Sequence, residues 1–574
     1  MKRSQNGSCG NTIYRFGLGI VRILTLLLAV LLFAGSFLTT CYADNMETQQ
    51  VLFRLDNPLW NLLELAGFGL LFCACLHFYD KFGRKFRRGL LIFTLGFLFC
   101  LGVLLILFGR TVPAADAMSV YNAALEWIQG NLDVIHPTVS YLSYYPQQIG
   151  LMAFLELFLR IWNLTGISAP AWHFIKLIYV CLLCTAVLFQ YLSLKYLWRE
   201  HWEEISCCYL LLVCCNLPMI MYSSFVYGEI PSFAALSVGL YLLLRLLSGI
   251  TFPDHIHTGS HEGISLKSSD SETVSCAVPS PELHSTWSTF FTGTGSILFL
   301  ALSVMLRKNS LIPIIAVLLV LLFESLRFGR SVRARLCLLG MAVCLAVTSV
   351  GILPLVQKCY EKKAGNTLSS GVTAMSYFAM GMQEASRGCG WYNGFNIDTY
   401  DAAGMDSALA NEISRQAVLE RLAYFRGHPG YAVDFYARKQ LSQWADGTYA
   451  SRQATLAAYG GRSGFFQEVY DGSLSSAYIE WGNAWQDVLY LGTLVFCVST
   501  VHRKRKNTAT APQGSDTDSL YLSLYLYVGL IAVLGGFLFH ILWEANSRYI
   551  FLYSLLLMPY CAAGIYTVFA EHAK

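Results

Sequence analysis

The chain has 574 residues, of which 55% are hydrophobic and only 13% are charged, and its mean hydropathy is +0.48. This composition excludes a soluble globular enzyme, a disordered chain and a fibrous repeat, and it indicates an integral protein of the lipid bilayer. Forty basic residues against 36 acidic ones leave a net charge of +4. Such a balance does not suit a nucleic-acid-binding protein, so we expect no nucleic-acid partner.

A membrane-spanning helix needs roughly 20 apolar residues, because a helix rises about 1.5 Å per residue and the hydrocarbon core is about 30 Å thick. By this rule the sequence predicts an all-α polytopic membrane protein with about twelve transmembrane helices. The first apolar run follows several basic residues and exceeds a signal-peptide core of about 7 to 15 residues, so we expect a retained helix. The predicted spans are 17–40, 59–79, 89–109, 172–195, 205–224, 230–248, 288–306, 310–327, 334–353, 485–501, 519–540 and 548–570.

Four clusters of Lys and Arg fall on one side of the membrane in this count, at 81–88, 195–199, 327–335 and 503–506. Because cytoplasmic loops are enriched in Lys and Arg, we expect these clusters in the cytoplasm. The segment 148–162 is apolar but short, and counting it as a span would place the later clusters opposite the first. We therefore predict an interfacial or re-entrant helix there. The resulting expectation is a multi-pass protein of the plasma membrane with both termini in the cytoplasm.

This topology divides the chain into four parts. We expect membrane helices at 1–88, a membrane core at 89–354 with an outer loop at 110–171, a cap at 355–486, and C-terminal membrane helices at 487–574. The cap has the size of a small domain and contains amphipathic helical patterns, which indicate a mainly helical extracytoplasmic insert.

Two polar segments have the composition of connecting loops. The stretch 251–288 is rich in Ser, His, Gly and Pro and is expected to be a cytoplasmic loop, and 508–518 is expected to be a short linker. His255, His257 and His261 could hold a metal, but in a Ser-rich loop we expect them to be solvated.

Cysteines are numerous, 18 in all, but most of them lie within apolar runs, where a thiol acts as a small hydrophobic group. They do not form a disulfide framework, and no pair has the spacing and polar context of a zinc site. Cys359 and Cys389 fall on the outer side and could pair, although sequence separation alone does not establish a disulfide.

The outer loop after the third span carries the first candidate functional residue. It begins Arg110-Thr-Val-Pro-Ala-Ala-Asp116 and predicts a turn followed by an amphipathic helix parallel to the membrane. Asp116 stands at the start of that helix, where a carboxylate is favoured by the helix dipole whatever its function. A structural and a catalytic interpretation of Asp116 are both open at this point.

The same loop contains an aromatic and amide patch, Tyr141-Leu-Ser-Tyr-Tyr145-Pro-Gln147-Gln148. Such a patch suits a sugar or a lipid headgroup, although Tyr is enriched at every membrane interface. We expect substrate contacts from Tyr145, Gln147 and Gln148, together with Tyr121 on the preceding helix.

The order of these features resembles the first outer loop of the GT-C superfamily of membrane glycosyltransferases: an acidic residue past an outer helix end, a membrane-parallel helix, and then Tyr-Pro-Gln-Gln before a short apolar helix. The superfamily includes the dolichyl-phosphate-mannose protein mannosyltransferases of family 39, the lipid A aminoarabinose transferases and many bacterial relatives of unassigned function, to which the chain looks most similar. The resemblance covers roughly residues 89–350 and the last two spans, and not 355–486.

The resemblance implies an inverting transfer of a sugar from a polyprenyl-phosphate donor to an acceptor on the outer face of the membrane. The acceptor could be a protein, a lipid or a wall polymer. Asp116 would be the general base that accepts the proton of the acceptor hydroxyl, a role typically worth about 10² to 10⁴ in rate. Glu229 would be a second acidic group that orients the acceptor or helps to bind a metal.

Basic residues at outer span ends could hold the donor phosphate. Arg307 and Lys308 depart from the positive-inside tendency, which suits phosphate binding and equally suits interfacial snorkelling. Arg548 could contact the same phosphate or pair with Glu544 at i,i+4 spacing. His540 completes this set of candidate substrate-binding residues.

The sequence departs from the mannosyltransferase pattern where an acidic pair is expected, since Ala117 follows Asp116, and it contains no Asp-x-Asp motif. We therefore expect no required cofactor: a divalent metal is possible but unsupported, because basic side chains could neutralise the phosphate.

Two other functions remain open. A multi-pass transporter or flippase for a lipid-linked or small polar substrate could use the same polar residues to line a path, although charges at mid-membrane depth and two related halves would be expected. A non-catalytic scaffold is the third interpretation.

Overall fold

The structure, a computed structural model, describes residues 2–43, 49–251, 286–327, 330–510 and 523–572. The predicted loop 251–288, with its three histidines, and the linker 508–518 lie almost wholly outside these residues.

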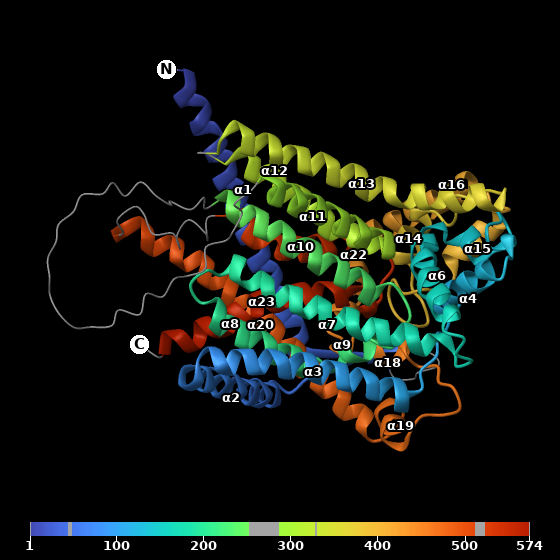
Figure 1. Ribbon diagram of the computed structural model, residues 1–574, viewed down its shortest axis with the longest axis horizontal. Coiled ribbons are helices and arrows are strands. Elements are labelled where there is room, and N and C mark those ends of the chain that lie inside the picture. Colours follow the sequence, from blue (N-terminus) through green and yellow to red (C-terminus); the bar gives the residue numbers. More distant parts are fainter. Residues whose placement is uncertain (1, 44–48, 252–285, 328–329, 511–522, 573–574) are drawn as a thin grey trace.

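The described residues form an all-α membrane bundle, as the apolar runs predict, with one small β-hairpin (Figure 1). Eleven helices of the described residues are long and apolar enough to cross a membrane, some of them with the short 3₁₀ turn that precedes them. They are α1 (Lys2–Leu38), α2 (Pro58–Phe82), α3 (Arg84–Gly109), α7 (Ala171–Leu197), α10 (Glu229–Thr251), α11 (Thr286–Leu306), α12 (Leu311–Leu326), α13 (Val332–Ala364), α20 (Leu474–Thr510), α22 (Val528–Leu542) and α23 (Ser547–His572).

The predicted span 205–224 is not among these helices. It is divided into α8 (Trp202–Cys215) and α9 (Leu217–Tyr222). The break has a local cause, because the side chain of Asn216 caps α9 by accepting a bond from the Met219 N–H, and Pro218 stands in the first turn. A proline in the first helical turn has no N–H to continue the preceding helix, so one apolar run becomes two helices.

The centre of the bundle is formed by α10, which packs against α7 and α11, and by α20, which packs against α23 and α1. Glycine allows the closest of these crossings: a Cβ on Gly564 would lie 1.8 Å from the carbonyl oxygen of Gly492 on α20. Small residues at such positions are a common way for membrane helices to approach each other.

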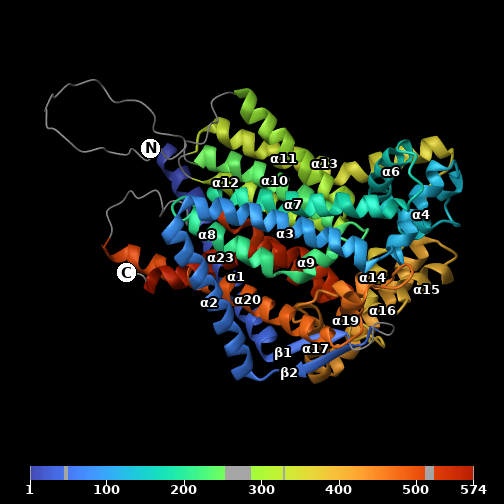
Figure 2. The same cartoon turned by 60° about the horizontal axis from the view of Figure 1, so that its bottom comes forward.

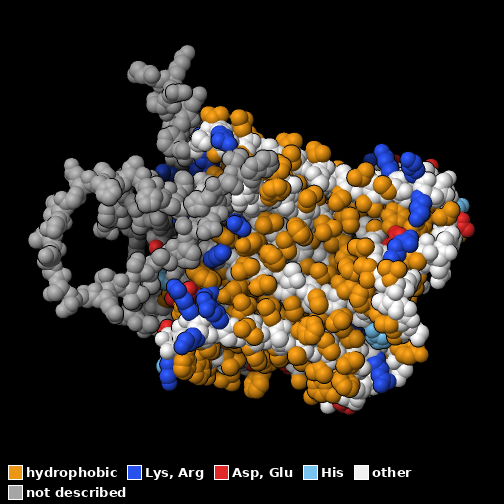
Figure 3. Space-filling view, viewed as in Figure 1, with side chains coloured by type: hydrophobic (Ala, Val, Ile, Leu, Met, Phe, Trp, Pro, Cys, Tyr) orange, Lys and Arg blue, Asp and Glu red, His pale blue; other side chains and the backbone are white. Residues whose placement is uncertain are grey.

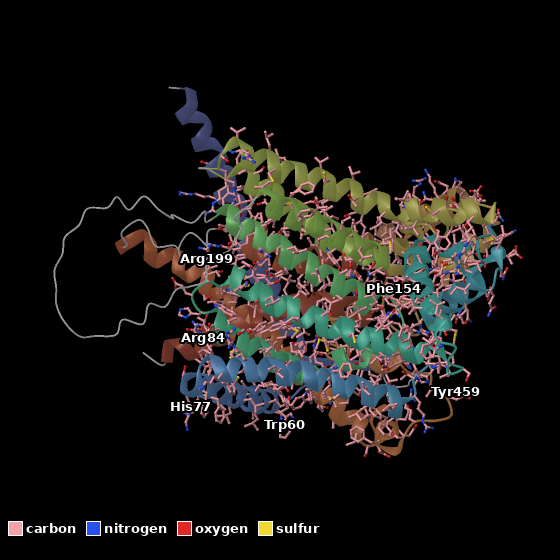
Figure 4. The ribbon with its side chains drawn as sticks, in the orientation of Figure 1. Trp60, His77, Arg84, Phe154, Arg199 and Tyr459 are labelled. Atoms are coloured by element: carbon pink, nitrogen blue, oxygen red, sulfur yellow. The ribbon has the colours of Figure 1, made fainter. Side chains whose placement is uncertain are left out.

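The two ends of the bundle differ. Arg84 and Arg199, from two of the predicted cytoplasmic clusters, lie toward one end, whereas Phe154 and Tyr459 lie toward the other (Figure 4). The chain begins and ends at the first of these ends (Figure 1). Between the ends, apolar side chains cover most of the visible face, and Lys and Arg gather toward the extremities (Figure 3). This is the surface expected of a protein that spans a bilayer.

The second end, which we call the outer end, carries the short helices. The loop helices are α4 (Asp116–Ile128), α5 (Tyr141–Tyr144) and α6 (Ile149–Leu164). The predicted short helix at 148–162 therefore exists as α6, and at 16 residues it is not among the candidate spans. The cap helices are α14 (Ala374–Gly381), α15 (Phe395–Ala402), α16 (Ser407–Gly427), α17 (Pro429–Trp444), α18 (Ser451–Ala454) and α19 (Gly464–Tyr470).

A β-hairpin that the sequence does not predict follows α1. Its strands β1 (Thr39–Ala43) and β2 (Val51–Leu55) pair antiparallel, with Thr39 opposite Leu55. The hairpin lies beside α17 of the cap, and the Cys41 N–H donates to the Ala445 carbonyl over 2.8 Å (Figure 2). It thereby connects the N-terminal helix to the cap.

Candidate active site

Asp116 is the first residue of α4, as predicted, and the turn before it is strained. Ala115 has φ 46° and ψ −129°, and Arg110 has φ 47°. Such conformations are unfavourable for residues with a Cβ and cost of order 1–3 kcal/mol each, so they persist only where the surroundings enforce them.

The segment between α18 and α19 holds this turn through two backbone hydrogen bonds. The Tyr459 N–H donates to the Arg110 carbonyl over 2.9 Å, and the Val112 N–H donates to the Ala457 carbonyl over 2.8 Å. The two bonds flank Thr111, which forms an antiparallel bridge with Ala458. The Asp116 side chain is half-buried, and its carboxylate accepts no hydrogen bond from the described residues.

Tyrosines gather around Asp116. Burial raises the pKa of Tyr227 and of Tyr145, and for each of them the Asp116 carboxylate is the next cause of the increase. The pKa of Tyr141 rises through burial, through Tyr227 and through Asp116. The Gln148 amide donates to the Tyr227 hydroxyl. The predicted residue Tyr145 therefore lies near Asp116, and Gln148 is bonded to Tyr227, which also lies near Asp116.

A second group consists of Arg307, Glu229 and Arg548, which we call the Arg–Glu–Arg cluster. An Arg307 Nη1 lies 2.9 Å from Glu229 Oε1, and Arg548 Nε lies 3.7 Å from the same oxygen. Only 13%, 4% and 20% of the side chains of Arg307, Glu229 and Arg548, respectively, are exposed. The cluster is therefore shielded from water, and ionic interactions are stronger in such a shielded place than in water.

The backbone brings the cluster together through Gly228. Glu229 opens α10, and Arg307 precedes the 3₁₀ turn Lys308–Ser310. A Cβ on Gly228 would lie 2.5 Å from the Leu306 carbonyl oxygen. Because only glycine permits this approach, the loop before α10 can lie directly against the end of α11.

Two aromatic rings join the clusters. The ring of Tyr227 has its centroid 5.4 Å from the Arg307 guanidinium and 5.7 Å from that of Arg548. Tyr549 contacts the same two guanidiniums at 5.9 and 5.6 Å. Such cation–π contacts hold planar guanidiniums without occupying all of their N–H groups. Tyr227 therefore contacts both guanidiniums with its ring, and the pKa of its hydroxyl is raised in part by Asp116.

The end of α22 closes one side of this region. The Tyr549 hydroxyl donates to Glu544 Oε2 over 3.2 Å, and burial raises the pKa of Glu544 to about 7. The ring of His540 stacks on Tyr549 with centroids 5.7 Å apart. Glu544 and His540 are thus in the same region as the Arg–Glu–Arg cluster, as the sequence suggests.

The cap supplies residues that the sequence analysis missed. Tyr377 stacks on Trp543 at 4.8 Å, and the pKa of Tyr392 is raised by burial, by Glu544 and by Asp116. Lys439 on α17 donates to the carbonyls of Gly381 and Ile541 over 2.5 and 2.9 Å, and burial lowers its pKa to about 7. Lys439 thereby holds the cap against the C-terminal end of α22. The sequence signal that comes nearest to Lys439 is one of the amphipathic helical patterns of the predicted cap, at residues 431–444.

Within the described part of the chain, no side-chain hydrogen bond or ion pair joins the other predicted residues to these clusters. Tyr121 is buried against Trp172, with ring centroids 6.0 Å apart. Gln147 is half-buried and makes no side-chain hydrogen bond with the described residues. Lys308 is exposed, which fits the snorkelling alternative, whereas the buried ion pair of Arg307 does not.

Two pairings suggested by the sequence are not formed. Arg548 makes its ion pair with Glu229 and not with Glu544, because the end of α22 turns Glu544 toward Tyr549. Cys359 and Cys389 are both free. The first lies exposed on α13 and the second is half-buried in the cap beside α17, so the long helix keeps them apart.

A cavity of about 60 Å³ lies beside Arg548. It is lined mainly by the β-hairpin, the α17–α18 region and the turn before α23, with Asp446, Asn546 and Gln453 among its polar residues. Among the described residues, no three His, Cys, Asp or Glu side chains gather closely enough to hold a metal ion. The expectation that no ion is required stays a prediction.

No family model matches the sequence, and no curated protein matches it. Solved structures with a similar backbone include two of an oligosaccharyltransferase. The archaeal oligosaccharyltransferase AglB from Archaeoglobus fulgidus, in complex with an inhibitory peptide and a dolichol-phosphate, is 13% identical with a TM-score of 0.45, and the match covers 86% of this chain and 51% of that one. The Archaeoglobus fulgidus oligosaccharyltransferase in the apo form is also 13% identical, with a TM-score of 0.43 and coverage of 85% and 51%. The chain spans about half the length of these structures. A likeness of this extent shows no activity.

Proposed function

We propose that the protein is an integral-membrane glycosyltransferase of the GT-C type, which moves a sugar from a polyprenyl-phosphate donor to an acceptor on the outer face of the plasma membrane. The observation that carries the proposal is the position of Tyr227. The Asp116 carboxylate lies close enough to help raise the pKa of the Tyr227 hydroxyl, and the Tyr227 ring contacts the guanidiniums of Arg307 and Arg548. Tyr227 therefore lies next to both the proposed proton acceptor, Asp116, and the proposed anion site, Arg307 and Arg548.

The anion site suits the donor. A sugar carried by a lipid phosphate enters from the bilayer, and its phosphate has to be held at the level where the spans end. Arg307 and Arg548 lie at such span ends with little exposure to water. Guanidiniums bind phosphate oxygens in pairs of parallel hydrogen bonds, and in a shielded site they stabilise the charge that develops on the leaving phosphate.

The proton acceptor suits the other half of the reaction. The acceptor hydroxyl forms a bond to the anomeric carbon as the bond from that carbon to the phosphate oxygen breaks. Asp116 accepts the hydroxyl proton, and the lipid phosphate leaves with the electron pair. Attack opposite the leaving group inverts the anomeric configuration. The tyrosines and Gln148 around Asp116 offer aromatic faces and hydrogen bonds of the kind that hold a sugar.

The test is sugar transfer in membranes that express the protein at matched levels. Radiolabelled polyprenyl-phosphate sugars are supplied to the wild type, to Asp116→Asn and to Asp133→Asn, an exposed acid of the same outer loop. We expect transfer by the wild type and by Asp133→Asn, and a loss of about 10² to 10⁴ for Asp116→Asn. Transfer no greater than in membranes without the protein would contradict the proposal, and movement of the intact lipid across the bilayer would favour a flippase.

A further inference from the structure

The Arg–Glu–Arg cluster has an unequal number of charges. Arg307 and Arg548 supply two positive charges, and Glu229, which contacts both, supplies one negative charge. The cluster therefore carries a net charge of one unit. Because the three side chains are largely removed from water, this charge is not screened as it would be at the surface.

Among the described residues, Glu229 is the carboxylate that forms ion pairs with both of these arginines. Lys308 is exposed, so solvent and salt screen its charge. Burial raises the pKa of Glu544 to about 7, so this carboxyl keeps its proton more readily than an exposed glutamate does. The carboxylate of Asp116 also acts on Arg548, but it lies beyond ion-pair distance of both guanidiniums.

Glu229 is also close enough to repel an anion that binds the two guanidiniums. Neither of its carboxylate oxygens accepts a well-aligned hydrogen bond from the described residues, although both oxygens are buried. The carboxylate is therefore held mainly by its two ionic contacts and by its position at the start of α10. An anion that binds the guanidiniums lies within a few ångströms of this negative charge.

We propose that Glu229 sets the charge of the donor site, so that the site accepts a lipid phosphodiester with one negative charge and disfavours a lipid diphosphate diester with two. This inference rests on the proposed function and specifies its donor as linked through a single phosphate. A singly charged diester neutralises the cluster, whereas a diphosphate leaves an uncompensated charge in a shielded place, which is costly. Glu229 is then a residue that determines specificity by repulsion.

The experiment compares binding of two unreactive lipids to the purified full chain in nanodiscs. One probe is a polyprenyl methyl phosphate, with one negative charge, and the other is a polyprenyl methyl diphosphate, with two. Binding is measured for the wild type, Glu229→Gln, Glu229→Asp and Lys308→Gln. We expect the wild type to prefer the monophosphate and Glu229→Gln to shift the affinity ratio toward the diphosphate by about tenfold or more.

The controls separate charge from other effects. Glu229→Asp keeps the negative charge and should keep the ratio, and Lys308→Gln removes an exposed charge that solvent screens and should also keep the ratio. If Glu229→Gln does not fold, Arg548→Gln tests the same charge in the opposite direction and should shift the ratio further toward the monophosphate. An unchanged ratio in Glu229→Gln and in Arg548→Gln would overturn the inference alone. Failure of the wild type to bind either lipid would overturn the proposed function together with it.

Discussion

At the scale of single residues, the candidate site contains carboxyl groups in three different environments. Asp116 is half-buried and accepts no hydrogen bond from the described residues, Glu229 is paired with two arginines, and Glu544 is buried with its pKa raised to about 7. Carboxyl groups in environments this different commonly have different roles. Of the three, Glu544 is the one for which burial raises the pKa into the neutral range.

The raised pKa of Glu544 predicts a pH-dependent stability. Between the ordinary value near 4.5 and about 7 the folded state keeps a proton that the unfolded state has lost, so this contribution disappears as the pH rises through 7. From about pH 5 to 8 the wild type should therefore lose up to roughly 3 kcal/mol of unfolding free energy that Glu544→Gln does not lose. Thermal unfolding of the purified proteins at both pH values measures the difference.

Comparing variants at the same pH removes the contribution of Lys439, whose pKa is also about 7. Glu420→Gln, at an exposed position on α16, serves as the control and should behave as the wild type does. If Glu544→Gln shows the same change with pH as the wild type, burial does not raise the pKa of Glu544.

The sequence could indicate Asp116, Arg307 and Arg548 because charged residues are unusual at the outer ends of apolar spans. It could not pair Glu229 with both arginines, because that depends on how three separate helix ends meet. Lys439 and the cap tyrosines were not found, because an amphipathic helix pattern shows which face is buried and not what it is buried against.

At the scale of elements, the position of the loop before α10 depends on Gly228. A Cβ there would lie 2.5 Å from the Leu306 carbonyl oxygen and 3.2 Å from the Cβ of Arg307. Gly228→Ala should move the two segments apart, destabilise the protein by about 1 to 3 kcal/mol and weaken donor binding. Thermal unfolding and lipid binding measure the two effects.

The matched control is Gly96→Ala on α3, where a new Cβ would meet no other residue within 4 Å. This variant should bind the donor as the wild type does. Equal donor binding by Gly228→Ala would mean that the close contact with Leu306 does not position the cluster.

The sequence predicts which helices exist better than it predicts where they begin and end. The apolar runs located the spans, but α13 continues to Ala364 and α20 begins at Leu474, both inside the predicted cap. Hydropathy marks where a helix leaves the bilayer, whereas the helix itself continues as long as its hydrogen bonds and packing allow. The β-hairpin was missed because its strands are short and adjoin an apolar helix.

At the scale of the whole molecule, the arrangement predicts a topology. The basic residues Arg84 and Arg199 lie toward one end and Tyr459 toward the other (Figure 4). An epitope inserted after Gly460, which is exposed, should be detected on intact cells, whereas one inserted after Ser269, in the predicted cytoplasmic loop, should be detected only after permeabilisation. Detection of the second epitope on intact cells would contradict the cytoplasmic assignment of the basic clusters.

The central claim is that Asp116 removes a proton from the acceptor during sugar transfer. Single-turnover transfer by the purified wild type and by Asp116→Asn, each saturated with the polyprenyl-phosphate sugar, tests it most directly. We expect both proteins to bind the donor equally and the rate of transfer to fall by about 10² to 10⁴ in the variant. Equal rates in the two proteins would contradict the assignment of Asp116 as the base.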